Sequence, residues 1–502
     1  MTYGRLSIPP FKEPRDLSRV GSIMDYETVI GLEVHVHLKT KTKAFCGCST
    51  EFGKEPNSQV CPVCLGFPGS LPVLNKAALE FAIKVALVLN CQVQDSTKFD
   101  RKNYFYPDLP KNYQISQYDL PLSRDGFLDI NTDGKTKRIG IRRIHLEEDA
   151  GKLIHREDAS LVDFNRSGIP LLEIVSEPEI TSAPQAYEYL TTLKSIIEYL
   201  DVSDCDMEKG SLRCDANISI RKKGSTELGT KIELKNMNSF KAVRDALVFE
   251  VERQSELLNE GKTVIQETRL WDIEELKTIP MRAKEEAQDY RYFPEPDLTT
   301  FIIERNRVEE IRKTIPELPR EKMHRFMKEY GLSEYDAKIL VASKKDADFA
   351  EECIKADEEK NKKPIANWLI GPLAQIAGLA NLSISEVKIP GGIPEFIKLK
   401  NFEKDGNISN LVAKSVLSES IARGIPASQI IRDKNLFQIS DSQKLDNIAE
   451  EVIKENTKSA ADYKQGKNNA LMFLVGQAMK KSQGKANPKA IQEILKRRLE
   501  HA

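Results

Sequence analysis

The spacing of apolar residues changes once along this chain, near residue 316, and this change limits the folds that the chain can adopt. Before it, segments such as TVIGLEVHVHL at 28–38 and TKIELKN at 230–236 alternate apolar and polar residues in twos, which is typical of half-buried strands. Beyond it, strand patterns almost vanish and helical spacing takes over. Because the predicted strands outnumber the helical patches among them, we predict an α+β fold with a largely antiparallel sheet, followed by an all-α region.

The chain is also long enough to form more than one hydrophobic core. Its 502 residues exceed the roughly 250–300 at which single cores stop growing. Pro316 and Pro319 interrupt the pattern where the spacing changes, and a last helical unit starts near Pro426. We therefore predict four parts: a flexible leader over 1–25, a mixed domain over 26–315, a helical domain over 316–425 and a small helical tail over 426–502.

Composition favours a cytoplasmic protein. Hydrophobic residues make up 40% and charged residues 30%, and no apolar run approaches the about 18 residues that a membrane span needs. The stretch 1–27 lacks the apolar core of a secretory signal and the character of a transit peptide. The formal net charge of −1 argues against a general nucleic-acid coat. Residues 461–502 nevertheless carry nine Lys or Arg against three Asp or Glu, an excess that by itself is equally compatible with a solvated helix face.

One predicted strand places three potential metal ligands in a row. Successive side chains of a strand face opposite sides, so Glu33, His35 and His37 share one face while Val34 and Val36 share the other. The valines can be buried, which leaves the polar row facing a cleft or solvent. An ordinary exposed face of an antiparallel strand would also explain such a row.

Two other predicted strands bring acidic residues that could complete a metal site. RRIHLEEDAGK offers His145, Glu147, Glu148 and Asp149, and PLLEIVSEPE offers Glu173 among apolar neighbours. A lone carboxylate in such surroundings is costly unless it is paired or binds a cation. If these strands are neighbours, four ligands can converge on a hard divalent ion: Glu33, His35, Glu173 and one of Glu147 or Glu148. Oxygen-rich ligation favours magnesium and tolerates manganese, and spacing alone does not decide between the two adjacent glutamates.

Four of the eight cysteines have the spacing of a thiolate metal site. Cys46, Cys48, Cys61 and Cys64 form C-x-C-x12-C-x2-C within a stretch that is dense in Gly and Pro. Four soft ligands on two tight turns suit tetrahedral zinc with no position left for water, which is typical of a structural site. Free or redox-active thiols are the alternative interpretation.

Signals for phosphate and nucleic acid are spread over several segments. No P-loop and no convincing dinucleotide-binding G-x-G-x-x-G is present, so a nucleotide would need another kind of fold. The run KFDRKNYFYPDLPKNYQISQYD interleaves basic residues with aromatic rings that can stack a base, and GSLRCDANIS and TKIELKN alternate charged residues on strand faces. The candidates for ATP or phosphate are Lys102, Ser211, Arg213, Asp215 and Lys235, and those for an RNA base are Tyr104 and Tyr106. A packed aromatic loop and charge pairs across strands are the alternative explanations.

Together these segments resemble one protein family. ETVIGLEVHVHLKTKTKAFC, KFDRKNYFYPDLPKNYQISQ, HLEEDAGK, GSLRCDANIS, ELKNMNSF, DYRYFPEPD and DYKQGKNNALMFLVGQAMKKSQGKANP are similar to motifs of the B subunit of the Asp/Glu-tRNA(Asn/Gln) amidotransferases, in the same order. The resemblance runs from about Tyr26 to the C-terminus. It implies a cradle domain related in fold to glutamine synthetase, followed by a helical domain and a tail that contacts tRNA.

The resemblance also implies an activity and partners. In this family the B subunit uses ATP and magnesium to phosphorylate the Glu or Asp esterified to a misacylated tRNA, and ammonia then displaces the phosphate. The ammonia is released from glutamine by the A subunit, an amidase, and the third partner is the small C subunit, which braces the other two against each other. Because the chain shows no Gly/Ser-rich amidase signature, we expect it to be unable to use glutamine alone.

The resemblance assigns roles to particular residues of this chain. The magnesium ligands of the family fall on Glu33, His35, Glu148 and Glu173, so it chooses Glu148 over Glu147. The four cysteines place the chain in the group of members that bind zinc. We further expect Glu148 to line the ammonia entrance, where a carboxylate can hold ammonium and take its extra proton. The resemblance also implies that the basic tail binds tRNA. The candidate residues for contacts to its phosphates are Lys464, Lys467, Lys480, Lys481 and Lys485.

Two other functions fit parts of the sequence. A non-catalytic, zinc-stapled RNA-binding protein would need neither Glu33 nor Glu173 and would not cleave ATP with magnesium. A zinc hydrolase is disfavoured because no H-E-x-x-H motif is present and the thiolate site has no open position. Within the resemblance, the sequence does not distinguish Glu on tRNA(Gln) from Asp on tRNA(Asn), which differ by one methylene.

Overall fold

The computed structural model divides the chain into two compact units. It describes residues 25–281, 289–437, 442–467, 469–482 and 486–500. Unit 1 extends from Met1 to Glu317, and unit 2 from Leu318 to Ala502. All but the last residue of the predicted leader, 1–25, lies outside the described residues. In the described part of the chain, no helix combines the length and the apolar character needed to cross a membrane.

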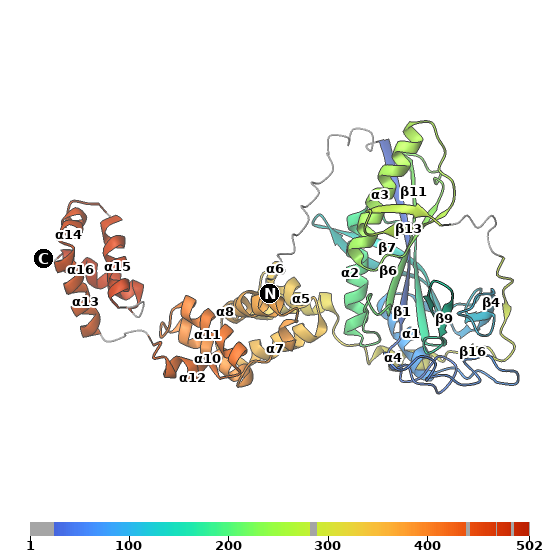
Figure 1. The fold of residues 1–502 in the computed structure, drawn as a ribbon, viewed down its shortest axis with the longest axis horizontal. Coiled ribbons are helices and arrows are strands. Elements are labelled where there is room, and N and C mark those ends of the chain that lie inside the picture. Colours follow the sequence, from blue (N-terminus) through green and yellow to red (C-terminus); the bar gives the residue numbers. More distant parts are fainter. Residues whose placement is uncertain (1–24, 282–288, 438–441, 468, 483–485, 501–502) are drawn as a thin grey trace. The chain divides into compact units, whose positions relative to one another are not determined.

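A nine-stranded sheet forms the centre of unit 1, in the order β14-β13-β12-β11-β1-β10-β7-β6-β2 (Figure 1). Its strands are β1 (Tyr26–His37), β2 (Gln92–Val93), β6 (Ser123–Thr132), β7 (Lys135–Glu148), β10 (Pro170–Ser176), β11 (Leu212–Lys222), β12 (Ile232–Lys235), β13 (Thr268–Asp272) and β14 (Lys277–Pro280). Neighbouring strands are antiparallel except for the parallel pair of β12 and β13. The predicted α+β class with a largely antiparallel sheet is confirmed.

Three helices pack against the apolar face of this sheet, and Figure 1 shows α2 and α3 running along it. They are α1 (Lys76–Val88), α2 (Ala183–Tyr199) and α3 (Phe240–Asn259). The hydroxyls of Ser182 and Ser239 accept backbone N–H groups at the starts of α2 and α3. Val34 and Val36 of β1 are fully buried on this face. The alternate residues of β1 therefore face the opposite, polar side of the sheet.

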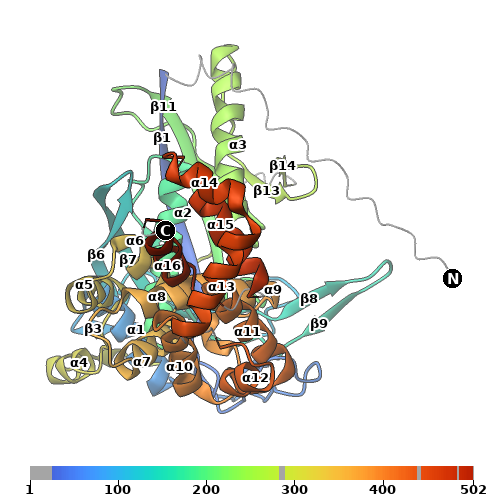
Figure 2. The ribbon, with the colours of Figure 1, turned by 90° about the vertical axis from the view of Figure 1, so that its left-hand side faces the viewer.

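Smaller strand pairs stand beside the large sheet in unit 1. β4 (Asp100–Asn103) lies between β5 (Tyr113–Ser116) and β15 (Phe293–Pro294), and β3 (Ser96–Thr97) pairs with β16 (Phe301–Ile302). β8 (Lys152–His155) and β9 (Ser160–Asp163) form a hairpin that extends away from the other strands of the unit (Figure 2). The helix α4 (Arg305–Arg312) packs against α1. The strands β4 and β5 come from the run of basic and aromatic residues that the sequence singles out, and the rest of that run lies outside these two strands.

Unit 2 is built from helices. They are α5 (Pro319–Tyr330), α6 (Glu334–Leu340), α7 (Lys344–Ala356), α8 (Lys363–Trp368), the π-helical turn η2 (Leu369–Leu373), α9 (Ala374–Leu379), the 3-10 turn η3 (Ile384–Glu386), α10 (Gly392–Lys404), α11 (Asn410–Arg423), α12 (Ala427–Asp433), α13 (Ser442–Glu455), α14 (Thr457–Lys464), α15 (Asn469–Lys481) and α16 (Pro488–Glu500). The last four share a core that includes Leu445, Leu474 and Leu495.

The sequence places the start of the tail near Pro426, but α12 buries Ile430 and packs against α10 and α11. The group of tail helices therefore begins at α13.

A fully buried ion pair connects two helices of unit 2. Nζ of Lys400 in α10 lies 2.9 and 2.8 Å from the two carboxylate oxygens of Asp357, the residue that directly follows α7. Both residues are 0% exposed. Such a pair contributes little net stability relative to an apolar pair, but removing one partner leaves the other charge buried without compensation.

We predict that Lys400→Met destabilises unit 2. The free energy of unfolding should fall by about 3–5 kcal/mol, because the carboxylate of Asp357 would stay buried and unpaired. Urea titration monitored by tryptophan fluorescence measures this, since Trp368 lies in the same unit. The exposed Lys398→Met is the matched control and should change the value by about 1 kcal/mol or less. Equal unfolding midpoints for the two variants would contradict the prediction.

Candidate active site

The polar face of the nine-stranded sheet carries a row of acidic and imidazole side chains. The strand register pairs His35 of β1 with Glu173 of β10, and Glu173 with His145 of β7. Because directly paired residues of neighbouring strands point to the same face, these three side chains line up across the sheet. Glu33, two residues before His35, extends the row along β1.

Three of these side chains form a site that could hold a metal ion. His35, Glu147 and Glu173 each offer one ligand atom, and these atoms lie within 4.8 Å of one another. Nε2 of His35 is 3.3 Å from Oε2 of Glu173 and 3.7 Å from Oε1 of Glu147. Nε2 of His145 approaches the same Glu173 oxygen to 3.3 Å. Two carboxylates and an imidazole directed at one point suit a hard divalent cation such as magnesium or manganese.

The charges in this cluster compensate one another. Burial opposes ionisation of Glu173, but the charge and hydrogen bonds of His145 and His35 hold the pKa of its carboxyl well below its usual range. Burial also disfavours a charged His145, but its two acidic neighbours raise the pKa of this imidazole to about 9. Burial, and then the charge of Glu173, raises the pKa of Glu33, whose carboxylate accepts a hydrogen bond from Nδ2 of Asn217 at 2.8 Å. A cation beside Glu173 would therefore favour the ionised form of Glu33.

The structure places Glu148, the ligand that the resemblance implies, on the other face of β7. Two consecutive strand residues point to opposite sides, so Glu147 and Glu148 do not share the cluster. The carboxylate of Glu148 forms an ion pair with Lys111 and accepts the backbone N–H of Ile115 at 2.9 Å. The sequence spacing leaves open which glutamate lies beside His35 and Glu173, and in this structure it is Glu147.

The predicted phosphate-binding residues of β11 and β12 flank the row on the same face. Arg213 pairs with His35 across the strands, and Asp215 pairs with Glu33. Nζ of Lys235 lies 2.7 Å from Oδ2 of Asp215, so this lysine points along the face toward β11. The structure thus brings Arg213, Asp215 and Lys235 together with the metal-ligand candidates.

The two remaining phosphate candidates lie outside the strands that form this face. The hydroxyl of Ser211, just before β11, contacts the carboxylate of Asp204 and accepts the backbone N–H of Asp206 at 2.8 Å, which holds the loop. Lys102 lies on β4 rather than on the large sheet, and its Nζ is 4.9 Å from the centre of the Tyr290 ring.

His37, the last residue of the polar row on β1, pairs with Asp149, which the sequence offers in the same segment as Glu147 but which the predicted metal site leaves out. Its Nε2 lies 2.5 Å from Oδ2 of the buried Asp149, whose Oδ1 lies 2.9 Å from a guanidinium nitrogen of Arg213. Arg166 approaches the same carboxylate to 3.4 Å. Burial opposes its ionisation, but Arg213 and His37 hold the pKa of Asp149 well below its usual range. Asp149 therefore fixes the guanidinium of Arg213 beside His35. His37 contacts the same carboxylate and so helps to position Asp149.

The sequence offers both His145 and Asp149 but assigns them no role, and the strand pattern is informative only for His145. His145 shares the strand face of Glu147 because it lies two residues earlier, so the same alternation that groups Glu33 with His35 applies to it. Asp149 directly follows the pair of glutamates, where the strand ends and alternation no longer predicts a direction.

Aromatic side chains border the cluster. Tyr118 stacks on Tyr292 with ring centres 4.2 Å apart, and Tyr104 packs edge-on against Tyr290 at 6.0 Å. Burial, and then the charges of the two cluster carboxylates, raises the pKa of Tyr292, so its hydroxyl lies in their field. Of the two rings predicted for RNA, Tyr104 is largely packed, whereas Tyr106 is 53% exposed.

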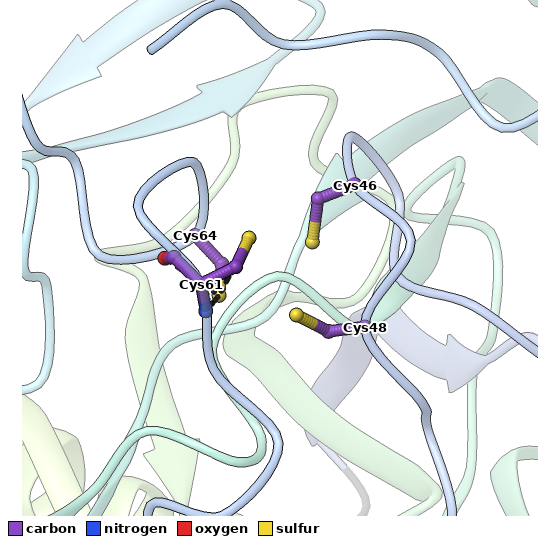
Figure 3. A group of neighbouring side chains, drawn as sticks. All are labelled: Cys46, Cys48, Cys61 and Cys64. Carbon is purple, nitrogen blue, oxygen red and sulfur yellow. Dashed lines mark hydrogen bonds between the residues drawn. The ribbon is translucent and has the colours of Figure 1, made fainter.

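The four predicted zinc ligands converge at a second site (Figure 3). The sulfurs of Cys46, Cys48, Cys61 and Cys64 lie within 4.8 Å of one another, with the first two cysteines on one loop and the last two on a facing loop. The backbone N–H of Cys61 donates to Sγ of Cys64 at 3.2 Å, a contact that favours a thiolate. A hydrogen bond from Cys46 lowers the pKa of Cys64 to about 4. Four converging sulfurs fit tetrahedral zinc.

The lysines predicted to bind tRNA differ in their surroundings. Lys467 forms an ion pair with Asp462 at 2.8 Å. Lys481 pairs with Glu451 at 2.8 Å and with a second glutamate of α13 at 2.6 Å. Lys464 ends α14 and Lys480 lies in the last turn of α15, and neither makes an ion pair within the part of the chain that is described. Lys485 lies outside the described residues.

Known proteins share both units of this chain. A family model described as the GatB/GatE catalytic domain matches residues 28–309, and one described as the GatB domain matches residues 348–499. The B subunit of the aspartyl/glutamyl-tRNA(Asn/Gln) amidotransferase of Caldanaerobacter subterraneus subsp. tengcongensis is 56% identical over 478 residues, which cover 95% of this chain and 100% of that protein. This chain belongs to that B subunit family. The proteins of the same name from Thermoanaerobacter sp. and Carboxydothermus hydrogenoformans are 55% and 54% identical, again over 95% of this chain, and over 100% and 99% of their own lengths.

For this member of the B subunit family, we predict that divalent-cation affinity depends on Glu147 more than on Glu148. Glu147→Gln should weaken manganese binding by about tenfold or more, because it removes one charged ligand of the cluster. Glu148→Gln should leave the affinity within about twofold, since its carboxylate faces Lys111 instead. Electron paramagnetic resonance titration of free manganese in the presence of each variant measures the two affinities. A larger loss of manganese affinity in Glu148→Gln than in Glu147→Gln would contradict the prediction and identify Glu148 as the ligand, as the family resemblance implies.

Proposed function

We propose that this chain is the subunit that amidates misacylated tRNA in an ATP-dependent reaction. Its substrate is Glu on tRNA(Gln), Asp on tRNA(Asn), or both. The observation that carries the proposal is the cluster of His35, Glu147 and Glu173 on the polar face of the sheet, in a chain that matches its B subunit relatives over their whole length. A non-catalytic RNA-binding protein would have no use for so costly a group of buried charges. The comparisons offer no support for that alternative.

The proposed reaction converts a side-chain carboxylate into an amide in two steps. A carboxylate is a poor acyl donor. In the first step its oxygen attacks the γ-phosphorus of ATP, and ADP leaves, which produces an acyl phosphate. In the second step the nitrogen of ammonia attacks the acyl carbon, inorganic phosphate leaves, and the nitrogen gives up one proton to a base.

The residues on the polar face can meet the needs of the phosphoryl step, which are positioning and neutralisation of charge. His35, Glu147 and Glu173 would hold magnesium, with Glu33 adjacent. When bound, the ion neutralises negative charge on the phosphates. The guanidinium of Arg213 is held in place by Asp149 and offers a second, fixed positive charge. The further candidates for contacts to ATP are Lys102, Ser211, Asp215 and Lys235.

Glu148 fits the amidation step better than the metal site. A cavity of about 180 Å³ lies between the cysteine loops and the ion pair of Glu148 with Lys111. We propose that ammonia reaches the sheet through this polar space, where the carboxylate of Glu148 can hold ammonium and accept its extra proton. The two faces of β7 would then serve the two steps of the reaction.

Other parts of the proposal concern partners and architecture. The relatives are named as one subunit of an enzyme, and we propose that this chain works in the cytoplasm with an amidase, the A subunit, and with a small C subunit. The amidase would release the ammonia from glutamine, and this chain would then use that ammonia to make the amide product. The four cysteines would bind a structural zinc ion, and unit 1 would form the cradle related to glutamine synthetase.

Reconstitution tests the proposed activity. The chain mixed with its A and C partner subunits, misacylated tRNA, ATP and glutamine should produce Gln-tRNA(Gln), Asn-tRNA(Asn) or both, as seen by chromatography of the amino acids released from tRNA. Glu173→Gln should lower the rate by roughly 100-fold to 1000-fold, because it removes a metal ligand and the partner of two histidines. The exposed Glu260→Gln is the matched control and should keep the rate. Full activity of Glu173→Gln would refute the assigned site, and an inactive wild-type mixture would refute the function.

A truncation tests the role of the tail helices. A chain ending at Phe437 lacks α13–α16 and should bind tRNA more weakly while it retains its ATPase site. In the full chain, Lys464→Ala with Lys480→Ala should reduce the salt dependence of log Kd by about one for each phosphate contact that the substitutions remove. Lys467→Ala with Lys481→Ala is the comparison and should have a smaller effect, because both lysines already pair with carboxylates. Filter binding at several salt concentrations measures this, and unchanged affinity in the truncated chain would count against a tail contact.

A further inference from the structure

Lys43 is a buried lysine next to the cysteine site. It follows β1 and is 1% exposed. Its Nζ lies 3.6 Å from Sγ of Cys64 and 3.1 Å from the carbonyl oxygen of Phe164. Its backbone N–H donates to the carbonyl of Cys48 at 3.0 Å, so both cysteine loops contact this one residue.

The ammonium of Lys43 lacks the carboxylate partner that buried lysines usually have. In the described part of the chain, no carboxylate lies within ion-pair distance of its Nζ, whereas the buried Lys400 is paired with Asp357. A buried charge without compensation is costly. The group next to the Lys43 ammonium that can become an anion is the sulfur of Cys64.

A loaded thiolate centre supplies the missing negative charge. Four thiolates around one divalent zinc ion sum to a net charge of about −2, and such centres are stabilised by N–H donors to their sulfurs. We propose that Lys43 is the counter-cation of this centre, donating a charge-assisted hydrogen bond to Cys64 that holds zinc in place. The inference rests on the zinc site within the proposed function and adds to it a residue outside the C-x-C…C-x-x-C pattern.

Lys43 also connects the cysteine loops to the segment behind Asp149. Its ammonium donates to the carbonyl of Phe164, and the N–H of the next residue, Ala44, donates to the carbonyl of Gly168 at 2.7 Å. The N–H of Gly168 in turn donates to the carbonyl of Asp149 at 2.8 Å. Because Asp149 fixes Arg213, the loaded centre supports the backbone on which the phosphate-facing guanidinium depends.

Zinc retention tests the role of the charge on Lys43. Full-length chains carrying Lys43→Met, Lys43→Gln or Lys43→Arg are compared with wild type and with the exposed Lys41→Met, by following transfer of zinc to a coloured chelator. Lys43→Met and Lys43→Gln should release zinc about 10-fold to 100-fold faster, whereas Lys43→Arg and Lys41→Met should stay near wild type. Glutamine can still donate to the carbonyl of Phe164 but has no charge, so it separates charge from hydrogen bonding. Retention of zinc at the wild-type rate in Lys43→Gln would overturn the proposal.

A second measurement needs no substitution, in case the uncharged variants do not fold. Hydrogen exchange of the wild-type chain is compared before and after zinc is removed by the chelator. Backbone exchange at 164–169 should become faster, while exchange in β13 and β14 should stay the same. Unchanged exchange at 164–169 would refute the connection through Lys43. A wild-type chain that binds no zinc would refute this inference together with the zinc site, and reconstituted amidation would still test the proposed function independently.

Discussion

Burial of one face of the nine-stranded sheet determines where the other parts of unit 1 can lie. Val34 and Val36 face the covering helices, so His35 and His37 must face away from them. A shift of one residue in the register of β1 would send every side chain to the opposite face. The polar row is therefore held in position by apolar packing on the reverse side of the sheet, and its own charges do not have to provide that stability.

Two buried carboxylates of unit 1, those of Glu173 and Asp149, are each balanced by neighbouring cationic groups. Glu173 lies between two imidazoles, and Asp149 contacts one imidazole and two guanidinium groups. Each carboxylate alone would be strongly destabilising in so dry an environment. Because it is paired with Asp149, the guanidinium of Arg213 is fixed beside the cluster. It therefore needs to reorganise less when a phosphate binds.

Sequence patterns predict those features of the site that depend on near neighbours in the chain. Alternation identifies β1 and its polar row, and cysteine spacing identifies the sulfurs that converge in Figure 3. The pairing of β1 with β10 joins residues more than a hundred positions apart, and its register follows from packing that no local pattern records. The choice between Glu147 and Glu148 depends on the register of β7 against β10, in which Glu173 pairs with His145. The sequence offers Asp149 but assigns it no role, because it lies just beyond the end of β7, where alternation no longer predicts a direction. The same limit applies to α12 in the helical unit. Pro426 correctly predicts where this helix starts, but its buried isoleucines pack against α10 and α11. The local pattern therefore predicts the helix but not the group of helices to which it belongs.

The two candidate centres share one continuous piece of chain, from Glu33 in β1 to Cys48 in the first cysteine loop. Inserting or deleting a residue between His37 and Cys46 would displace one centre relative to the other. In the stretch between Cys48 and Cys61, Asn57 is held by hydrogen bonds to Val162 and Asp163, whereas the stretch 51–54 is exposed. Over evolutionary time, changes of length in this part of the sequence can therefore accumulate at 51–54, while the segment between His37 and Cys46 has to keep its length.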